Sequence, residues 1–194
     1  MTQKILRINA SLRKKGSYSR ALSDRLITRL QSQTPTTIKE RDLADGIALI
    51  NEAWAEANAS DIAERTAEQR AVLSCSDALI NELKSANTIV IGLPIYNFNV
   101  PATFKAWIDQ VARAKVTFRY GENGAEGLLK NKKAYVIISS GGTQLGSDID
   151  FVSNYIHHVL GFIGIENVTI IDSSGIGREE EKVIVSAHDK IDNI

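Results

Sequence analysis

The chain has 194 residues, of which 43% are hydrophobic and 24% are charged, and this composition indicates one globular domain spanning residues 1–194. Its 23 basic and 23 acidic side chains leave no net charge, which argues against nucleic acid or an anionic membrane as a partner. The single cysteine, Cys75, excludes an intramolecular disulfide, and no cysteine–histidine spacing suggests a metal site. A strand-like run begins soon after Met1, and no apolar stretch approaches the roughly 18 residues of a membrane span. We therefore expect a soluble cytoplasmic protein without a signal peptide.

Four short runs rich in isoleucine and valine predict β-strands. They are Ile5–Ile8, Ile89–Leu93, Tyr135–Ile138 and Val168–Ile171. None alternates polar with apolar residues, which is typical of strands covered on both faces in a parallel sheet. A fifth run, Thr36–Arg41, does alternate and suits an edge strand.

Apolar residues at helical spacing predict helices between these strands. The stripes are Leu22, Leu26 and Leu30; Val72, Leu79, Ile80 and Leu83, ending near Ala86; Phe104, Trp107, Ile108 and Val111; and Val152, Ile156, Val159 and Ile163. Pro101 stands where the third of these helices should open, a position that favours proline. A last, charged helix is expected from about Glu179, with Val183, Ala187 and Ile191 on one side.

Strands alternating with helices predict an α/β fold of three layers, with a five-stranded parallel sheet between two layers of helices. Right-handed crossovers favour the strand order 2-1-3-4-5. Two segments are additional to the five strands and the helices that connect them. Leu43–Arg65 is rich in alanine and acidic residues and is expected to be partly helical. Val116–Lys130 carries glycines around an Asn123-Gly124 turn signal, so a hairpin or lid is expected at about 116–130.

Ligands of such sheets bind beyond the carboxyl ends of the strands, where the strand order reverses. The loop after the first strand holds Ser11, Ser17 and Ser19 and leads into a helix, whose free N–H groups favour an anion. It contains neither GxGxxG nor GxxxxGKS/T, which favours a mononucleotide over a dinucleotide or a nucleoside triphosphate. The alternative is an ordinary serine N-cap beside a solvated basic run, Arg13–Lys15, and the loop alone does not separate the two.

The loop after the third strand, GLPIYNFNVP, is unusually aromatic for a solvated turn. Pro94 and Pro101 limit its backbone freedom, so the N–H groups between them can be held in place for a planar ligand. Tyr96 and Phe98 can supply apolar walls. The alternative is that Phe98 packs into the core and Asn97 makes a turn, and we favour the ligand interpretation.

The loop after the fourth strand begins with Ser139, Ser140, Gly141 and Gly142. Paired glycines let the backbone approach a ligand closely, although a flexible connection between elements would also account for two glycines. Together the three loops describe a flat heterocycle with a phosphate tail, and flavin mononucleotide (FMN) fits this description. The phosphate would lie at the first loop and the ring edge against residues 95–98 and 139–142. Because the cofactor itself carries hydride chemistry, no catalytic side chain is expected.

Five segments, in chain order and spread over nearly the whole sequence, resemble those of a known family. They are SLRKKGSYS, GLPIYNFNVPATFKAWID, VTFRYGENGAEGLL, SSGG and LGFIGIENV. The family is that of the FMN-dependent NADH-azoreductases, which are flavodoxin-like NADH:quinone oxidoreductases. The resemblance implies that the phosphate of one non-covalent FMN per subunit is held by Ser11, Ser17, Tyr18 and Ser19. It also implies that the isoalloxazine is lined by Ile95, Tyr96, Asn97, Phe98, Ser139, Ser140, Gly141 and Gly142.

The resemblance further implies a ping-pong reaction. NADH passes a hydride to FMN and leaves, and a quinone or an aromatic azo compound then takes two electrons, the azo compound being cleaved to amines. The family is homodimeric with active sites at the interface, so Phe98, Tyr120 and Phe162 are expected to line the substrate pocket. Many members have arginine at the position of Ser140 and an aromatic residue or histidine near Gln144, so these two positions bear on substrate choice.

Two other functions stay open, namely an FMN reductase that releases reduced flavin and a flavodoxin-type electron carrier. Carriers tend to be strongly acidic for partner docking, whereas this chain is neutral. Several conspicuous residues are given no functional role. His157 and His158 are expected on a helix surface, His188 in solvent, Cys75 buried and inert, and Trp107 in the core.

Overall fold

Five parallel strands form the centre of the protein in a computed structural model that describes residues 2–122 and 124–194. The strands are β1 (Gln3–Asn9), β2 (Thr36–Asp42), β3 (Thr88–Pro94), β6 (Lys133–Ser140) and β7 (Asn167–Ser174). Their spatial order is β2-β1-β3-β6-β7, and every neighbouring pair is parallel. Because β4 and β5 form a separate hairpin, β6 and β7 are the fourth and fifth strands of the large sheet.

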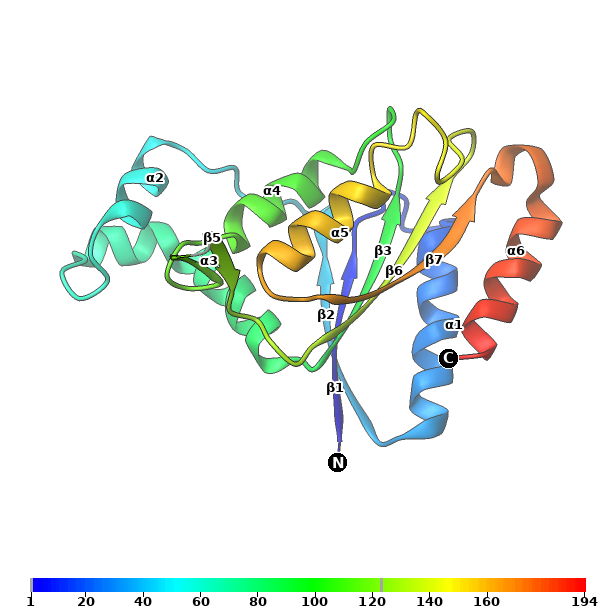
Figure 1. The fold of residues 1–194 in the computed structure, drawn as a ribbon, viewed down its shortest axis with the longest axis horizontal. Coiled ribbons are helices and arrows are strands. Elements are labelled where there is room, and N and C mark those ends of the chain that lie inside the picture. Colours follow the sequence, from blue (N-terminus) through cyan, green and yellow to red (C-terminus); the bar gives the residue numbers. More distant parts are fainter. Residues whose placement is uncertain (1, 123) are drawn as a thin grey trace.

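Helices cover both faces of this sheet, which confirms the expected α/β architecture (Figure 1). On one face lie α1 (Tyr18–Gln33) and α6 (Ile176–Asp192), and on the other lie α3 (Ala67–Ser85), α4 (Ala102–Val111) and α5 (Ser153–Phe162). None of the helices within the described ranges is long and apolar enough to cross a membrane.

The central strands are buried because successive side chains enter opposite helical layers. In β3, Ile89 and Ile91 pack toward α3, α4 and α5, while Val90 between them packs toward α1 and α6. All seven residues of β3 are buried, whereas most of β2 is exposed, which confirms β2 as an edge strand. The apolar run in β7 suggested cover on both faces, but Val168–Ile170 is only half-buried. The reason is that β7 is the strand at the other edge of the sheet.

The inward face of α3 differs from the sequence prediction. Val72 is 40% exposed and Cys75 is also exposed, while Leu73 and Ser76 are buried. The expectation that Cys75 is buried is therefore wrong. The boundary of the buried stripe lies at Leu73 because this residue packs against Trp54 of a neighbouring helix, a contact that helical periodicity alone does not show.

The remaining predictions about individual side chains have mixed outcomes. Trp107 is fully buried, and His157 and His158 are exposed on α5, as expected. His188 was expected in solvent and is half-buried on α6. The last helix, Ile176–Asp192, is interrupted at Glu179, whose φ and ψ are −140° and 55°. The charged helix therefore starts near Glu179 as expected, and a short helical turn from Ile176 precedes it.

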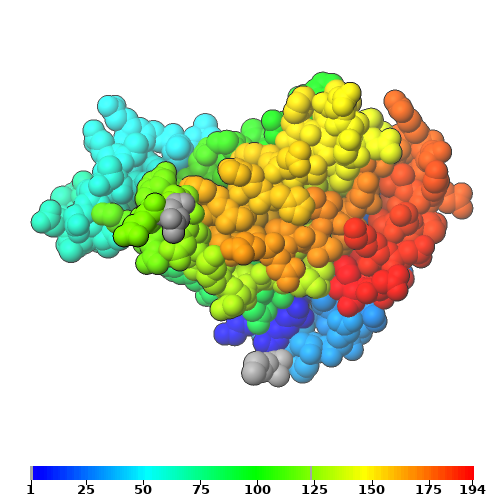
Figure 2. All heavy atoms as spheres, viewed as in Figure 1, coloured from blue at the N-terminus to red at the C-terminus, as the bar shows by residue number. Residues whose placement is uncertain are grey.

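The segment Leu43–Arg65 is partly helical, as predicted, with a short 3-10 turn, η1 (Leu43–Asp45), and one α-helix, α2 (Glu52–Ala59). It protrudes at one end of the molecule, shown in cyan in Figure 2. The indole N–H of Trp54 donates to Gln110 Oε1 at 3.0 Å, which fastens α2 to α4.

The predicted insertion within Val116–Lys130 contains a hairpin of β4 (Phe118–Gly121) and β5 (Gly124–Gly127), which pair antiparallel. Asn123 of the predicted turn lies outside the described residues. The hairpin reaches the body of the protein through a backbone contact in which Gly127 lies against Gly164. A Cβ atom added to Gly127 would lie 2.1 Å from the backbone nitrogen of Gly164.

We expect Gly127→Ala to lower the free energy of unfolding by about 1 to 3 kcal/mol, because the new methyl group overpacks two rigid backbones. Gly161→Ala is the matched control, since an added Cβ there has nothing within 4 Å and the residue lies inside α5. Urea denaturation of the two variants measures the effect. A Gly127→Ala protein as stable as wild type would contradict this packing.

Candidate functional site

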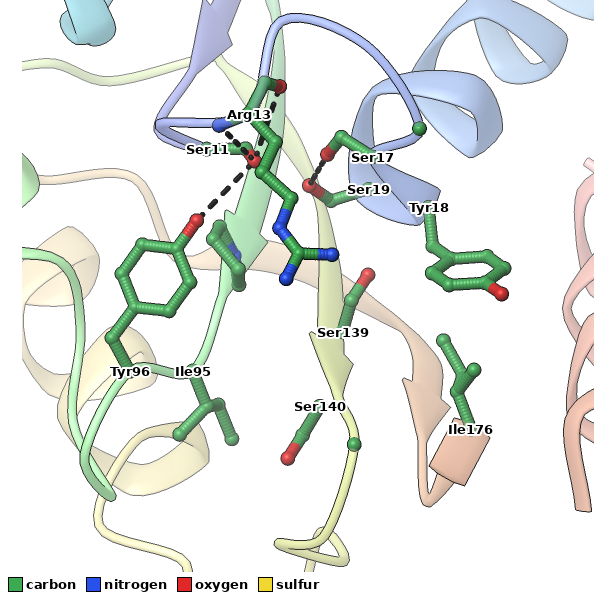
Figure 3. Close-up of a pocket in the computed structure, with 13 residues that line it drawn as sticks. Ser11, Arg13, Ser17, Tyr18, Ser19, Ile95, Tyr96, Ser139, Ser140 and Ile176 are labelled. Atoms are coloured by element: carbon green, nitrogen blue, oxygen red, sulfur yellow. Dashed lines mark hydrogen bonds between the residues drawn. The ribbon is translucent and has the colours of Figure 1, made fainter. Parts of the chain in front are cut away.

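A pocket of about 240 Å³ lies at the carboxyl edge of the sheet (Figure 3). It is formed by the loops after β1, β3 and β6 together with the start of α6. Of the predicted cofactor residues, those that line it are Ser11, Ser17, Tyr18, Ser19, Ile95, Tyr96, Ser139, Ser140 and Gly141. The neighbouring Asn97, Phe98 and Gly142 do not belong to its lining. Three loops that are far apart in the sequence thus meet at one point.

The serine hydroxyls of the first loop face the pocket. Ser17 is the N-cap residue of α1, but its side chain makes no capping hydrogen bond, and its Oγ lies 3.2 Å from Oγ of Ser19. Ser19 and Ser11 are only 1% and 2% exposed. The ordinary N-cap alternative therefore does not account for the Ser17 hydroxyl, which stays available to a ligand next to the helix N-terminus.

Arg20 holds this loop on the sheet. Its guanidinium donates to both carboxylate oxygens of Asp42, at 2.7 and 2.8 Å, and also to the backbone oxygen of Ser11 at 2.7 Å. The hydrogen bonds from Arg20 keep the pKa of Asp42 below its ordinary value, and a bond from the backbone N–H of Ala44 acts in the same direction. One ion pair at the end of β2 thereby positions the backbone that precedes the phosphate loop.

Tyr18 makes a contact that the sequence does not suggest. Its hydroxyl donates to Oε1 of Glu180 at 2.6 Å and so joins the start of α1 to α6. This hydrogen bond to a carboxylate raises the pKa of the Tyr18 phenol. Because the hydroxyl is engaged there, a phosphate contact from Tyr18 would come from its backbone N–H at the helix terminus.

The loop after β3 is a tight turn. Tyr96 and Asn99 exchange two backbone hydrogen bonds of 3.0 and 3.1 Å, and between them Asn97 and Phe98 have φ of 49° and 68°. Such left-handed conformations cost about 1 to 3 kcal/mol each in residues other than glycine. The N–H of Ile95 donates to the backbone oxygen of Ser139 at 2.8 Å, which ties this turn to the end of β6.

Four lining residues were not predicted, namely Arg13, Gly16, Pro94 and Ile176. Ile176 is the first residue of α6, which follows the end of β7 at the same carboxyl edge. Extending the rule for ligand sites to the fifth strand would have nominated it. This segment docks closely, since the N–H of Gly177 donates to the backbone oxygen of Gly141 at 3.0 Å. A Cβ on Gly177 would lie 2.8 Å from that oxygen, so only glycine permits the approach.

The residues proposed for a substrate pocket lie outside this lining. Phe98 and Tyr120 are 54% and 76% exposed. Phe162 is half-buried, and its ring centroid lies 4.3 Å from that of Phe118 in the hairpin. A shared role for these residues in substrate binding therefore stays a prediction.

The pocket fits one end of a flavin mononucleotide. Its volume is below the roughly 300 to 1,000 Å³ of pockets that enclose a whole drug-sized ligand, so it would hold the phosphate end and leave the ring against the exposed turn at 96–98. Within the described part of the chain, the backbone N–H groups of Asn97 and Phe98 have no hydrogen-bond partner, and they can donate to a ring edge.

Five parallel strands between helical layers, with a hydroxyl-lined pocket at the switch point of the strand order, define the flavodoxin-like class. A family described as having a flavodoxin-like fold matches residues 3–194. The chain is 60% identical to FMN-dependent NADH:quinone oxidoreductase 1 of Colwellia psychrerythraea, over 98% of this chain and 99% of that protein. It is 45% identical to the protein of the same name from Hahella chejuensis, over 97% of this chain and 93% of that protein.

The chain therefore belongs to the flavodoxin-like family and, within it, to the group of FMN-dependent NADH:quinone oxidoreductases. Among solved structures, it is similar to an FMN-dependent NADH-azoreductase from Bacillus anthracis in complex with FMN. The TM-score is 0.85 at 28% identity, and the match covers 98% of this chain and 96% of that one.

We expect Asp42→Asn to lower the free energy of unfolding at neutral pH by about 1 to 3 kcal/mol, because Arg20 loses its partly buried counter-ion. A carboxyl whose pKa is lowered in the folded state stabilises only while it is ionised. The difference from wild type should therefore shrink as the pH falls below the ordinary Asp value of 3.8. Urea denaturation across pH measures this.

Asp45→Asn is the matched control, because Asp45 pairs with Lys14 in an exposed ion pair. This variant should unfold like wild type at every pH. Equal effects of the two substitutions would contradict the positioning role of the Arg20–Asp42 pair.

Proposed function

We propose that the protein is an FMN-dependent NADH:quinone oxidoreductase that also reduces aromatic azo compounds to amines. The pocket at the carboxyl edge of the sheet carries this proposal, because it combines serine hydroxyls at a helix N-terminus that make no capping hydrogen bond there with an aromatic turn and glycine backbone. The names of relatives up to 60% identical, and of a similar FMN-bound azoreductase, support the same activity. Bound FMN would supply the two-electron chemistry between NADH and the acceptor.

The side chains and backbone of this chain would bind and orient FMN. Ser11, Ser17 and Ser19, with the first N–H groups of α1, hold the phosphate. The rigid turn after β3 and the loop beginning with Ser139, Ser140, Gly141 and Gly142 present backbone N–H groups to the ring edge. Such donors favour the negative charge that a reduced flavin acquires, and they need no reorganisation because the turn is fixed by its own hydrogen bonds.

An enzyme is favoured over an electron carrier because the chain has no net charge with which to steer a protein partner. The aromatic turn and the hairpin also suit small acceptors such as quinones. We further propose that residues 1–194 form one FMN-binding domain with the hairpin as its insertion, since the family match extends over residues 3–194. A reducing compartment, the cytoplasm, suits a chain with a single unpaired cysteine.

We expect the purified protein to retain FMN through gel filtration and to lose its flavin absorbance within seconds of anaerobic NADH addition. Subsequent addition of a quinone should restore the oxidised spectrum. Stopped-flow absorbance measures both half-reactions. No bleaching by NADH would indicate a carrier, and loss of flavin on the column would indicate a reductase that releases it.

A double variant, Ser17→Ala with Ser19→Ala, should bind FMN at least about 10-fold more weakly, because hydrogen bonds to a charged group are lost. Ser32→Ala is its control, since this hydroxyl bonds only within the far end of α1. Unchanged FMN affinity in the double variant would place the phosphate elsewhere.

We also propose a homodimer with active sites at the interface, in which Tyr120 and Phe162 approach the flavin of the partner subunit. Large apolar side chains that a monomer would leave in solvent support this proposal, among them Tyr120, Ile149 and Phe151.

Light scattering should give twice the 21.3-kDa mass of the chain. Phe151→Glu should shift the protein toward monomer by placing a charge in the apolar interface. Val185→Glu is the control, because Val185 is similarly exposed but lies in α6 on the other face of the sheet. Equal effects of both substitutions, or a monomeric wild type, would contradict the proposed interface.

A further inference from the structure

Arg13 is the one charged side chain among the thirteen residues that line the pocket. The other polar lining groups are serine and tyrosine hydroxyls. In Figure 3 the Arg13 side chain extends from the loop after β1 toward the other lining residues, and it stays exposed to solvent at the mouth of the pocket. Its guanidinium has no hydrogen bond or ion pair with any residue in the ranges 2–122 and 124–194. An unpaired cation therefore faces the pocket.

The backbone of the loop gives Arg13 this direction. Its N–H donates to Oγ of Ser11 at 3.2 Å, and its carbonyl oxygen lies 3.4 Å from the same hydroxyl. The next residue is directed differently, since Nζ of Lys14 pairs with Oδ1 of Asp45 at 2.6 Å, away from the pocket lining. The basic run Arg13–Lys15 is thus divided, with one cation facing the pocket and its neighbour paired outside it.

This arrangement matters for a phosphate. Neutral hydroxyls and helix N–H groups stabilise a phosphate dianion by hydrogen bonds, but they leave most of its charge uncompensated. A guanidinium can bind two phosphate oxygens at once through charge-assisted hydrogen bonds. Removing the phosphate from the ligand would leave the guanidinium without a partner, so the residue can distinguish phosphorylated from unphosphorylated ligands.

We propose that Arg13 is the counter-ion of the FMN phosphate and makes the pocket select FMN over riboflavin. The proposal rests on the proposed function, in which this pocket holds FMN. A phosphate could also arrive as the pyrophosphate of NADH. FMN is the favoured source because Arg13 shares its loop with Ser11 and Ser17, which face the same end of the pocket.

The test is the affinity of the apoprotein for FMN and for riboflavin, measured by quenching of flavin fluorescence. Arg13→Ala should weaken FMN binding by about 10-fold and leave riboflavin binding within twofold of wild type, so that selectivity falls. FMN binding by Arg13→Ala should also depend less on salt, because one exposed cation no longer contributes. Arg13→Lys keeps the charge but not the planar guanidinium, so its FMN affinity should lie between those of Arg13→Ala and wild type.

Lys14→Ala is the matched control and should bind both flavins like wild type, since Lys14 is already paired with Asp45. Equal weakening of FMN and riboflavin in Arg13→Ala would show that Arg13 only shapes the loop, and this would overturn the proposal. Unchanged FMN affinity together with a raised KM for NADH would assign Arg13 to the pyrophosphate and would also overturn it. A wild-type protein that binds no FMN would instead refute the proposed function itself, and this proposal with it.

Discussion

The burial of parallel central strands from both faces is the constraint on which the rest of the structure depends. In β3 and β6 nearly every residue is buried, so both helical layers must pack onto the sheet and the chain must cross over between successive strands. Parallel strands end at the same edge, and their following loops meet there. The pocket is a consequence of this topology, because none of the three loops forms a binding site by itself.

A few polar contacts then fix the loops relative to one another. Arg20 holds the backbone of Ser11, the end of β6 holds Ile95, and Gly177 binds the backbone of Gly141. These contacts engage backbone groups, and the hydroxyls of Ser17 and Ser19 hydrogen-bond only to each other within the described residues. Such an arrangement is preorganised, since a ligand need not reorder the loops when it binds. The contact between Ile95 and the end of β6 also holds the strained turn after β3 in place.

Most elements could be predicted because local patterns determine them. Uninterrupted apolar runs identify strands covered by helices, and an alternating run identifies the edge strand β2. Predictions failed where the neighbours of an element decide its environment. Cys75 is exposed because α2 packs to one side of α3 at Leu73, and Val168–Ile170 of β7 is half-buried because β7 ends the sheet. Neither fact is encoded in the segment concerned.

The sequence by itself determined the strands and helices, the hairpin insertion and the three loops richest in ligand-binding residues. The spacing of apolar residues and the backbone preferences of glycine and proline determine structure over only a few residues, so their effects can be predicted directly from the sequence. Only the tertiary structure decided that Ile176 completes the pocket, that the Tyr18 hydroxyl bonds to Glu180, and that Arg13 lines the pocket while Lys14 pairs with Asp45 outside it. These side chains are directed by contacts with residues distant in the chain, and such contacts exist only once the sheet has assembled.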